Sequence, residues 1–176
     1  MRSIFFYMDR SYLLQSSRPS IQDMAVAQFR SIIFEDAKLR SRIVDGTCDL
    51  VASDRAGEQL DHTTFRDAIS MFHDLSTYTT IFEPRFLELS QSYTMRWVET
   101  AVAEKSLADY VRSAVGLAEK EKQRCEIFGL DTTTRRDLVT ILEDHLVQRQ
   151  QDRLGKCNFE DAFPARTRGS RTNPQQ

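Results

Sequence analysis

Residues 79–105 read TTIFEPRFLELSQSYTMRWVETAVAEK, and this stretch decides the fold class. Its large apolar side chains recur at three- and four-residue steps, at Phe82, Phe86, Leu89, Tyr93, Trp97 and Ala101. This spacing is the period of an α-helix that buries one face. At 1.5 Å per residue, the stretch predicts a helix roughly 40 Å long. Its buried face is expected to include Trp97.

The rest of the chain also has the composition and spacing of α-helices. Only four prolines and six glycines occur among 176 residues, and no run alternates apolar and polar residues long enough to indicate a sheet. The sequence therefore predicts an all-α fold of stacked antiparallel helical bundles with short connections. Besides 79–105, the expected helices cover residues 3–16, 20–36, 38–55, 62–76, 106–128 and a last helix from residue 134.

Polar residues and glycines mark the expected helix ends. Capping-box-like pairs are Ser20 with Asp23, Ser106 with Asp109 and Thr134 with Asp137, while Asp61 caps the helix over 62–76. Gly57 and Gly129 are expected to close helices in the left-handed conformation. The expected inner faces carry Ile21, Ala25, Phe29, Ile32 and Ile33; Leu39, Ile43, Leu50 and Val51; Phe65, Ala68, Ile69 and Phe72; and Leu138, Ile141, Leu142, His145 and Leu146.

Composition excludes several classes of function. The net charge of −2 provides no general field for nucleic acid, so no direct nucleic-acid partner is expected. Neither a membrane span nor a secretory signal is predicted, because Asp9 and Arg10 interrupt the longest uncharged apolar stretch after six residues, from Ser3 to Met8. Three widely spaced cysteines fit reduced thiols, and we expect the cytoplasm and nucleus.

The residue spacings typical of phosphate-binding loops and metal sites are also absent from the sequence. No two glycines are close enough for a phosphate-binding loop, and neither CxxC nor HExxH occurs, so no cofactor and no metal site are predicted. The sharpest enzymatic hypothesis is a nucleophilic Cys125 or Cys48 with a remote histidine. Cys125 falls on an apolar helical face, however, and His73 and His145 resemble histidines at the edge of a core. We therefore expect no catalytic residues, and the charges from Glu119 to Arg124 are expected on a solvated helix face.

The first helix differs from the others. Ile4, Phe5, Phe6, Tyr7 and Met8 are consecutive, and Tyr12, Leu13 and Leu14 follow, so the helix is apolar around most of its circumference. Such a helix needs cover on more than one side, from another protein or from a longer chain. Residues 157–176 differ again, with three arginines, two prolines and few apolar side chains, and we expect this tail to be disordered.

Several stretches together resemble the cullin family. Tyr7-Met8-Asp9-Arg10-Ser11-Tyr12 resembles the YxDRxY signature on the last helix of the first cullin repeat. Agreement continues in the same order at Phe29-Arg30, at Arg55-Ala56-Gly57-Glu58 with Asp61, at Phe82-Glu83 with Phe86-Leu87-Glu88, over residues 110–124, and at Thr133-Thr134 with Leu138. The resemblance covers about residues 4–155, and its detail is most similar to type-4 cullins.

This resemblance implies a stalk of five-helix cullin repeats in a RING ubiquitin ligase. Residues 1–16 would be the last helix of a first repeat, 20–130 a second repeat and 131–156 the start of a third. The chain would be a non-catalytic scaffold fragment that binds adaptor or substrate-receptor subunits, for a type-4 cullin a β-propeller adaptor of the damaged-DNA-binding protein type. The matching adaptor-binding residues are Tyr7, Arg10, Ser11, Tyr12 and Leu14. The alternative is a stand-alone truncated protein that sequesters or tethers adaptors without a role in ubiquitin transfer.

Overall fold

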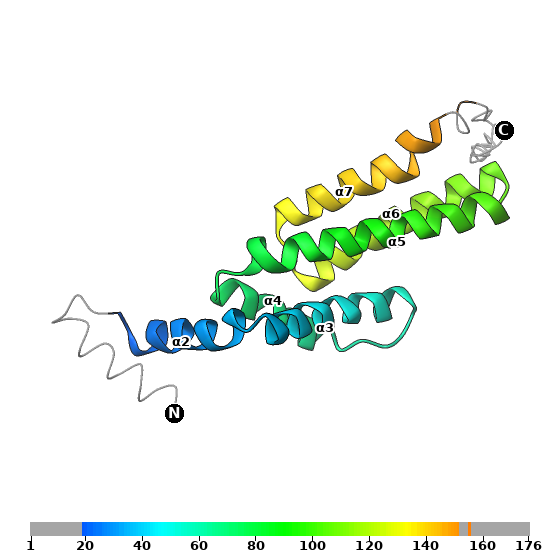
Figure 1. The fold of residues 1–176 in the computed structure, drawn as a ribbon. Helices are drawn as coiled ribbons and strands as arrows, with labels where there is room; N and C mark the ends of the chain where they lie inside the picture. Colours follow the sequence, from blue (N-terminus) through cyan, green and yellow to red (C-terminus); the bar gives the residue numbers. More distant parts are fainter. Residues whose placement is uncertain (1–18, 152–154, 156–176) are drawn as a thin grey trace, which may run out of the picture. The chain divides into compact units, whose positions relative to one another are not determined.

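The computed structural model describes residues 19–151 and 155 and confirms the all-α prediction (Figure 1). Its α-helices are α2 (Ile21–Glu35), α3 (Ala37–Arg55), α4 (His62–Asp74), α5 (Glu83–Glu104), α6 (Leu107–Phe128) and α7 (Thr132–Leu146). A π-helical turn, η1 (Tyr78–Phe82), precedes α5, and a 3₁₀ turn, η2 (Gln148–Gln150), follows α7. No strand occurs in this part of the chain. The helix predicted over 3–16 and the disorder predicted for 157–176 lie outside it.

Most of the predicted helix starts are confirmed by hydrogen bonds. Ser20 and Asp23 form a reciprocal capping box, in which the Asp23 N–H donates to Ser20 Oγ (2.9 Å) and the Ser20 N–H donates to Asp23 Oδ2 (3.2 Å). Asp36 ends α2 and begins α3, because its carboxylate accepts from the N–H groups of Lys38 and Leu39. The first helical turns thereby gain acceptors for N–H groups that have no partner within the helix.

Other boundaries follow the expected chemistry with one exception. Asp61 caps α4 by accepting from the Thr63 N–H at 2.9 Å. Gly57 (φ 86°) and Gly129 (φ 68°) have left-handed backbones, as predicted for residues that close helices. The prediction that Thr134 caps the last helix is wrong, since α7 begins two residues earlier and Thr134 is buried inside it.

The predicted helix over 79–105 divides into η1 and α5, and the boundary lies beside Pro84. Pro84 has no N–H and leaves the carbonyl four residues earlier without an α-helical donor. Just before Pro84, the Glu83 N–H donates to the Tyr78 carbonyl five residues earlier, which is the π-helical pattern. A proline at this position then suits the first turn of α5.

Two compact units divide the described chain. Unit 1 holds the described residues up to Leu89 together with Ile127–Asp131, and unit 2 holds Ser90–Glu126 and the described residues from Thr132. Figure 1 shows α2 followed by α3, with α4 returning alongside α3 after the loop that contains Gly57. The repeat boundaries inferred from the resemblance stay a prediction.

Unit 1 is organised around aromatic rings. Phe65, Phe72 and Phe82 are fully buried. The Phe82 ring stacks on Phe72 (centroids 5.0 Å apart) and meets Phe65 edge-on (6.3 Å), while Phe65 packs against Phe128 (4.2 Å). These contacts confirm the face predicted for the helix over 62–76. They place the core of unit 1 between α4, η1 and the C-terminal end of α6.

The faces predicted for α2 and α3 are wrong in most positions. In α3, the fully buried side chains are Val44, Thr47, Cys48 and Val51, whereas Leu39 is exposed and Ile43 and Leu50 are only half-buried. In α2, Phe34 alone is fully buried. Apolar side chains surround much of both helices, so their spacing does not determine which side faces the core.

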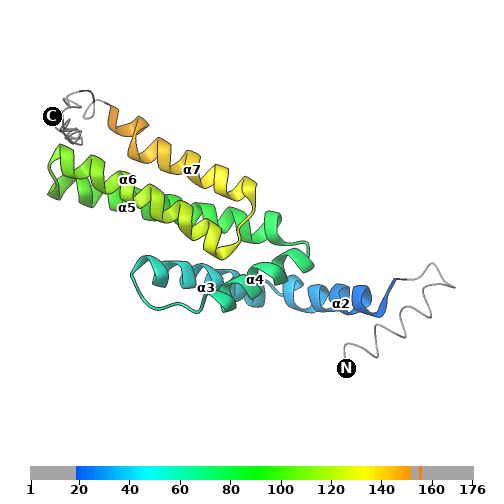
Figure 2. The ribbon, with the colours of Figure 1, turned by 180° about the vertical axis from the view of Figure 1, so that it is seen from behind.

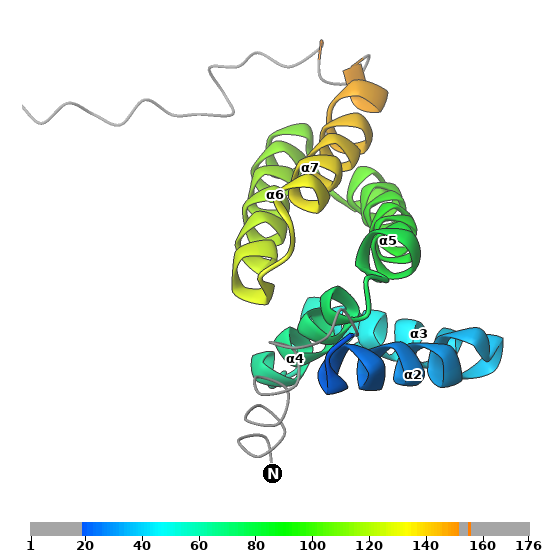
Figure 3. The same ribbon diagram turned by 90° about the vertical axis from the view of Figure 1, so that its left-hand side faces the viewer.

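Unit 2 contains α5 from Ser90 onward, α6 up to Glu126, and α7. These parts lie alongside one another in the view from behind and in the view along the helices (Figures 2 and 3). Tyr110 is almost completely buried in α6, and its hydroxyl donates to the Leu146 carbonyl at 3.0 Å. This bond connects α6 to the C-terminal end of α7, where the predicted inner residues Leu138, Leu142, His145 and Leu146 are buried.

The buried line along α5 differs from the predicted stripe. It starts at Phe82 in η1 and continues in α5 through Phe86, Ser90, Thr94, Val98 and Ala101, while Leu89, Tyr93 and Trp97 are half-buried. Ser90 and Thr94 are small enough to be enclosed, and Thr94 Oγ1 donates to the Ser90 carbonyl at 2.9 Å, which satisfies the buried hydroxyl within the helix. The aromatic side chains therefore flank the buried line from Ser90 onward.

We expect Trp97→Ala to lower the free energy of unfolding by about 1–3 kcal/mol, less than the loss of a fully enclosed aromatic side chain. Trp97 is half-buried, with its ring 6.1 Å from Tyr110 and Lys105 Nζ 5.5 Å from its centroid. Chemical denaturation followed by circular dichroism measures the effect. A loss above about 4 kcal/mol would show that Trp97 is enclosed.

Candidate functional site

The five residues predicted to bind an adaptor, Tyr7, Arg10, Ser11, Tyr12 and Leu14, lie outside the described residues. The described element nearest to them in the sequence is α2, which begins at Ile21 after the capping residue Ser20. The surfaces of α2 and its neighbours are therefore the first candidates for a site.

One face of α2 carries exposed apolar side chains. The exposed fraction is 38% for Ile21, 45% for Phe29 and 60% for Ile32, and Ala25 on the same face is also exposed. At about 100° per residue, these four residues share one side of the helix. We call Ile21, Ala25, Phe29 and Ile32 the outer stripe of α2. The sequence predicted this stripe but assigned it to the core.

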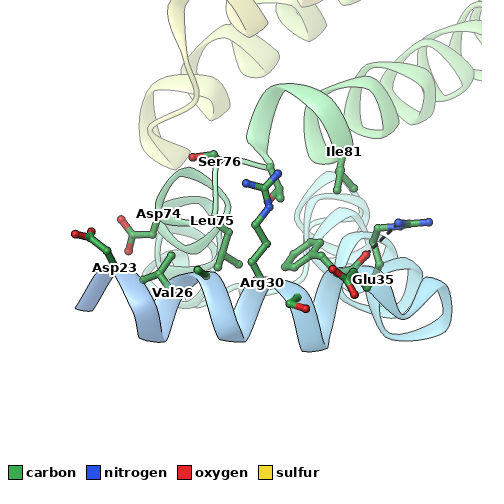
Figure 4. Close-up of a pocket in the computed structure, with 13 residues that line it drawn as sticks. Asp23, Val26, Arg30, Glu35, Asp74, Leu75, Ser76 and Ile81 are labelled. Carbon is green, nitrogen blue, oxygen red and sulfur yellow. Dashed lines mark hydrogen bonds between the residues drawn. The ribbon is translucent and has the colours of Figure 1, made fainter. Parts of the chain in front are cut away.

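The opposite face of α2 borders a groove of about 550 Å³. In Figure 4, Val26 and Arg30 project from α2 toward Leu75 and Ser76, in the turn that follows α4. Phe34 also lines the groove and meets Phe72 edge-on at 6.2 Å. This face anchors α2 in unit 1, so the outer stripe points away from the unit's own core.

The groove has no single ligand chemistry. Its lining includes both acidic and basic side chains, Asp23, Arg30, Glu35, Arg40 and Asp74. Arg40 Nη1 donates to the Phe34 carbonyl at 3.1 Å, which ties the start of α3 to the end of α2. An open groove of mixed charge lacks the enclosed apolar walls typical of small-molecule sites.

The cysteines of the described chain are placed for packing. Cys48 and Cys125 are both buried, and burial raises the pKa of the Cys48 thiol to about 12. A thiol with this pKa stays protonated at neutral pH and is a poor nucleophile. No group of three or more histidine, cysteine or acidic residues suited to a metal ion occurs among the described residues.

Because its thiol is buried and protonated, we expect Cys48 to resist alkylation in the native protein at pH 7.5 and to react only after unfolding. Cys125, with 2% exposure, should behave in the same way. Iodoacetamide labelling followed by peptide mass spectrometry measures each site separately. Rapid labelling of either thiol in the native state would restore the enzymatic hypothesis.

His73 and His145, which the sequence predicts at the edge of a core, both have structural surroundings. His73 stacks on Tyr78 with ring centroids 4.2 Å apart, and its Nε2 lies 3.3 Å from Asp131 Oδ1. His145 is buried, and burial lowers its pKa, with a smaller contribution from Arg149. The placement of His73 beside a buried tyrosine fits its predicted position at the edge of the core, whereas His145 lies within it.

The expectation of a solvated face from Glu119 to Arg124 is wrong at Glu121. Glu119 and Lys120 are exposed, but the Glu121 side chain is only 1% exposed, and it accepts a hydrogen bond from Arg124 Nη1. Glu121 lies four residues after Leu117 and four before Cys125, both of which are buried. This spacing places Glu121 on the inner face of α6, so it could have predicted from the sequence that Glu121 is buried.

The class of this protein follows from its packed helices and from its match to a known family. The described chain is a set of packed helices with an exposed apolar helix face, which are features of a protein-interaction scaffold. A family model described as the cullin alpha solenoid domain matches residues 1–166. The chain belongs to the cullin family.

Curated relatives agree with this family. The chain is 33% identical to Cullin-4A of Mus musculus and to Cullin-4A of Homo sapiens over 148 residues, which is 84% of this chain and 19% of each relative. It is 26% identical to Cullin-3A of Arabidopsis thaliana over 156 residues, 88% of this chain and 21% of the relative. The chain thus spans about a fifth of the length of the curated relatives it matches.

None of the described helices combines the length and the apolar character required to span a membrane.

Proposed function

We propose that this chain is a non-catalytic scaffold segment of a cullin-RING ubiquitin ligase and that it binds an adaptor subunit through the helix predicted over residues 3–16. The observation that carries the proposal is the match of the cullin family model to residues 1–166, which includes the Tyr7–Tyr12 signature. The identity to Cullin-4A supports a type-4 adaptor, the triple β-propeller of the damaged-DNA-binding protein type. We place this function in the cytoplasm and nucleus.

The proposed mechanism is geometric. Packed helices hold an adaptor at one position, while chemistry belongs to other subunits of the ligase. Buried aromatic rings in unit 1 and the Tyr110–Leu146 bond in unit 2 give each unit a defined core. The buried, protonated thiol of Cys48 supports a structural rather than a nucleophilic role.

The proposed adaptor contacts are Tyr7, Arg10, Ser11, Tyr12 and Leu14. Tyrosine and arginine are the side chains most often found at the energetic centre of protein interfaces, because they combine large contact area with directed hydrogen bonds. We expect Tyr7 and Arg10 to contribute most of the binding energy. An adaptor-sequestering protein would make the same first interaction.

Binding of the purified chain to the purified β-propeller adaptor tests the proposal directly. Biolayer interferometry should detect binding to the unaltered chain and a loss of at least about tenfold for Tyr7→Ala combined with Arg10→Ala. Val115→Ala, at a side chain of α6 that is 47% exposed, serves as the matched control and should bind like the unaltered chain. Absence of binding by the unaltered chain, or equal binding by all three proteins, would contradict the proposal.

A further inference from the structure

The groove between α2 and the turn after α4 is lined by charged side chains that the packing of unit 1 does not use. Arg30, Glu35 and Asp74 line it, and none of them forms a hydrogen bond or an ion pair with another described residue. The hydroxyl of Ser76, on the turn, makes no hydrogen bond to a described residue either. These polar groups are therefore available to a ligand that enters the groove.

The charges follow a fixed order along the groove. Figure 4 shows Asp23 and Asp74 at one end, Arg30 in the middle and Glu35 at the other end. The lining thus alternates acidic, basic and acidic. From Asp23 to Glu35 the helix rises about 18 Å, which is the length of about six residues of an extended chain. A ligand that reaches all three positions is a segment of a protein rather than a small molecule.

Apolar side chains lie between the charged groups. Phe34 and Leu75 line the groove and are buried, while Val26 and Ile81 line it and are half-buried. Half-buried apolar side chains of this kind gain contact area when a partner's side chain packs on them. The groove therefore combines an apolar contact surface with charges in a defined order, as interfaces between proteins do.

The backbone at Ser76 gives independent support for a ligand. The Ser76 N–H donates to the His73 carbonyl (2.8 Å) and the Thr77 N–H donates to the Phe72 carbonyl (2.9 Å), which are the two hydrogen bonds of a Schellman motif. Glycine usually occupies the position of Ser76, because the backbone there is left-handed (φ 53°) and a Cβ atom adds strain. Serine at this position costs stability but supplies a hydroxyl at the border of the groove.

Asp74 is a second residue that costs stability at the same border. It is the last residue of α4, where the partial negative charge of the helix end disfavours a carboxylate. No cationic side chain among the described residues pairs with it. Locally unfavourable residues that cluster at one place are typical of binding sites, where function retains them. A ligand of the groove accounts for both Asp74 and Ser76.

We propose that this groove binds a segment of a partner protein in which an acidic side chain is flanked by basic side chains. The acidic side chain meets the guanidinium of Arg30 and the hydroxyl of Ser76. One basic side chain meets Asp74 and Asp23, and the other meets Glu35. Apolar side chains of the segment pack between these charges. This contact is additional to the adaptor contact proposed for residues 3–16 and does not depend on it.

Selection of random peptides displayed on phage, with the purified chain as the target, identifies the chemistry that the groove accepts. The enriched peptides should share an acidic residue flanked by basic ones. In fluorescence anisotropy, synthetic copies should bind Arg30→Ala at least about tenfold more weakly than the unaltered chain. Their binding to the unaltered chain should weaken as salt is raised. Arg42→Ala, at an exposed position of α3 outside the groove, is the matched control and should bind like the unaltered chain.

Two further variants separate the loss of a contact from the loss of the fold. Ser76→Gly and Asp74→Asn each remove a local cost, so both proteins should unfold at the same urea concentration as the unaltered chain or at a higher one. Each should still bind the selected peptides at least about threefold more weakly, because a polar contact is lost. Full binding by both variants would overturn the proposed contacts.

A charge reversal tests the order of the charges. Selection on Arg30→Glu with Asp74→Lys should enrich peptides in which a basic residue takes the place of the central acidic one. Enrichment of the same peptides on both proteins, or no enrichment on the unaltered chain, would overturn the proposal. Selected peptides that match a stretch of this chain would assign the groove to the chain itself or to a second copy, and would overturn a separate partner.

Discussion

Phe82→Ala is expected to lower the free energy of unfolding by about 3–5 kcal/mol, more than the loss expected for Trp97→Ala. Phe82 is fully buried, and its ring lies within 6.3 Å of the centroids of Phe65, Phe72, Tyr78 and Phe86. Removing it leaves a cavity at the centre of the aromatic cluster of unit 1, and rings in contact with one another cannot collapse into that space. Urea unfolding followed by circular dichroism measures the loss.

Met95→Ala provides the matched control for Phe82→Ala. Met95 belongs to α5, the helix that follows η1, but is 40% exposed, so its replacement should change stability by no more than about 0.5 kcal/mol. Phe82→Leu should give an intermediate loss, because it retains part of the buried volume. A Phe82→Ala protein as stable as the Met95→Ala protein would show that the aromatic cluster is not the core of unit 1.

Arg124→Ala is the second change with a large expected effect, a loss of about 3–5 kcal/mol. The substitution removes the ion-pair partner of Glu121, whose carboxylate is 1% exposed. A buried carboxylate that loses a cationic partner keeps the cost of leaving water with less attraction to offset it. Thermal or chemical unfolding at pH 7.5 measures the difference.

A double substitution separates the ion pair from simple packing. Glu121→Leu with Arg124→Leu replaces both charges by apolar side chains and should cost less than Arg124→Ala alone, because no buried charge is left behind. Lys122→Ala, at an exposed position between the two, should be close to neutral. If Arg124→Ala and Lys122→Ala changed the free energy of unfolding by the same small amount, the result would show that Glu121 is exposed to solvent rather than buried.

The positions and ends of most helices could be predicted from the sequence, because they depend on residues that are close together along the chain. The Ser20–Asp23 capping box and the left-handed glycines at positions 57 and 129 were predicted and confirmed. Each depends on hydrogen bonds or backbone angles within a few residues. The misplaced start of α7 shows the limit of this reading, since Thr134 and Asp137 have capping-box spacing but lie inside the helix.

From the sequence, the residues of the candidate site could be predicted, but the surfaces that they contact could not. The resemblance supplied Tyr7, Arg10, Ser11, Tyr12 and Leu14, which stay a prediction. The exposed stripe on α2 was read correctly as apolar and incorrectly as core. Periodicity identifies a face of a helix, but the partner of that face is set by elements distant in the sequence.

By itself, the sequence determined that this chain is all-α and which family it resembles. It also determined where most of its helices begin and end, because these features depend on the spacing and turn chemistry of residues that are close together in the sequence. The inner faces of α4 and α7 were also predicted correctly, whereas only the tertiary structure decided which faces of α2, α3 and α5 are buried. It enclosed Ser90 and Thr94 in α5, placed Trp97 at the edge, buried Glu121 with Arg124, and exposed Ile32 on α2. The physical reason is that burial depends on what packs against a helix from elsewhere in the chain, and an amphipathic period contains no information about that neighbour.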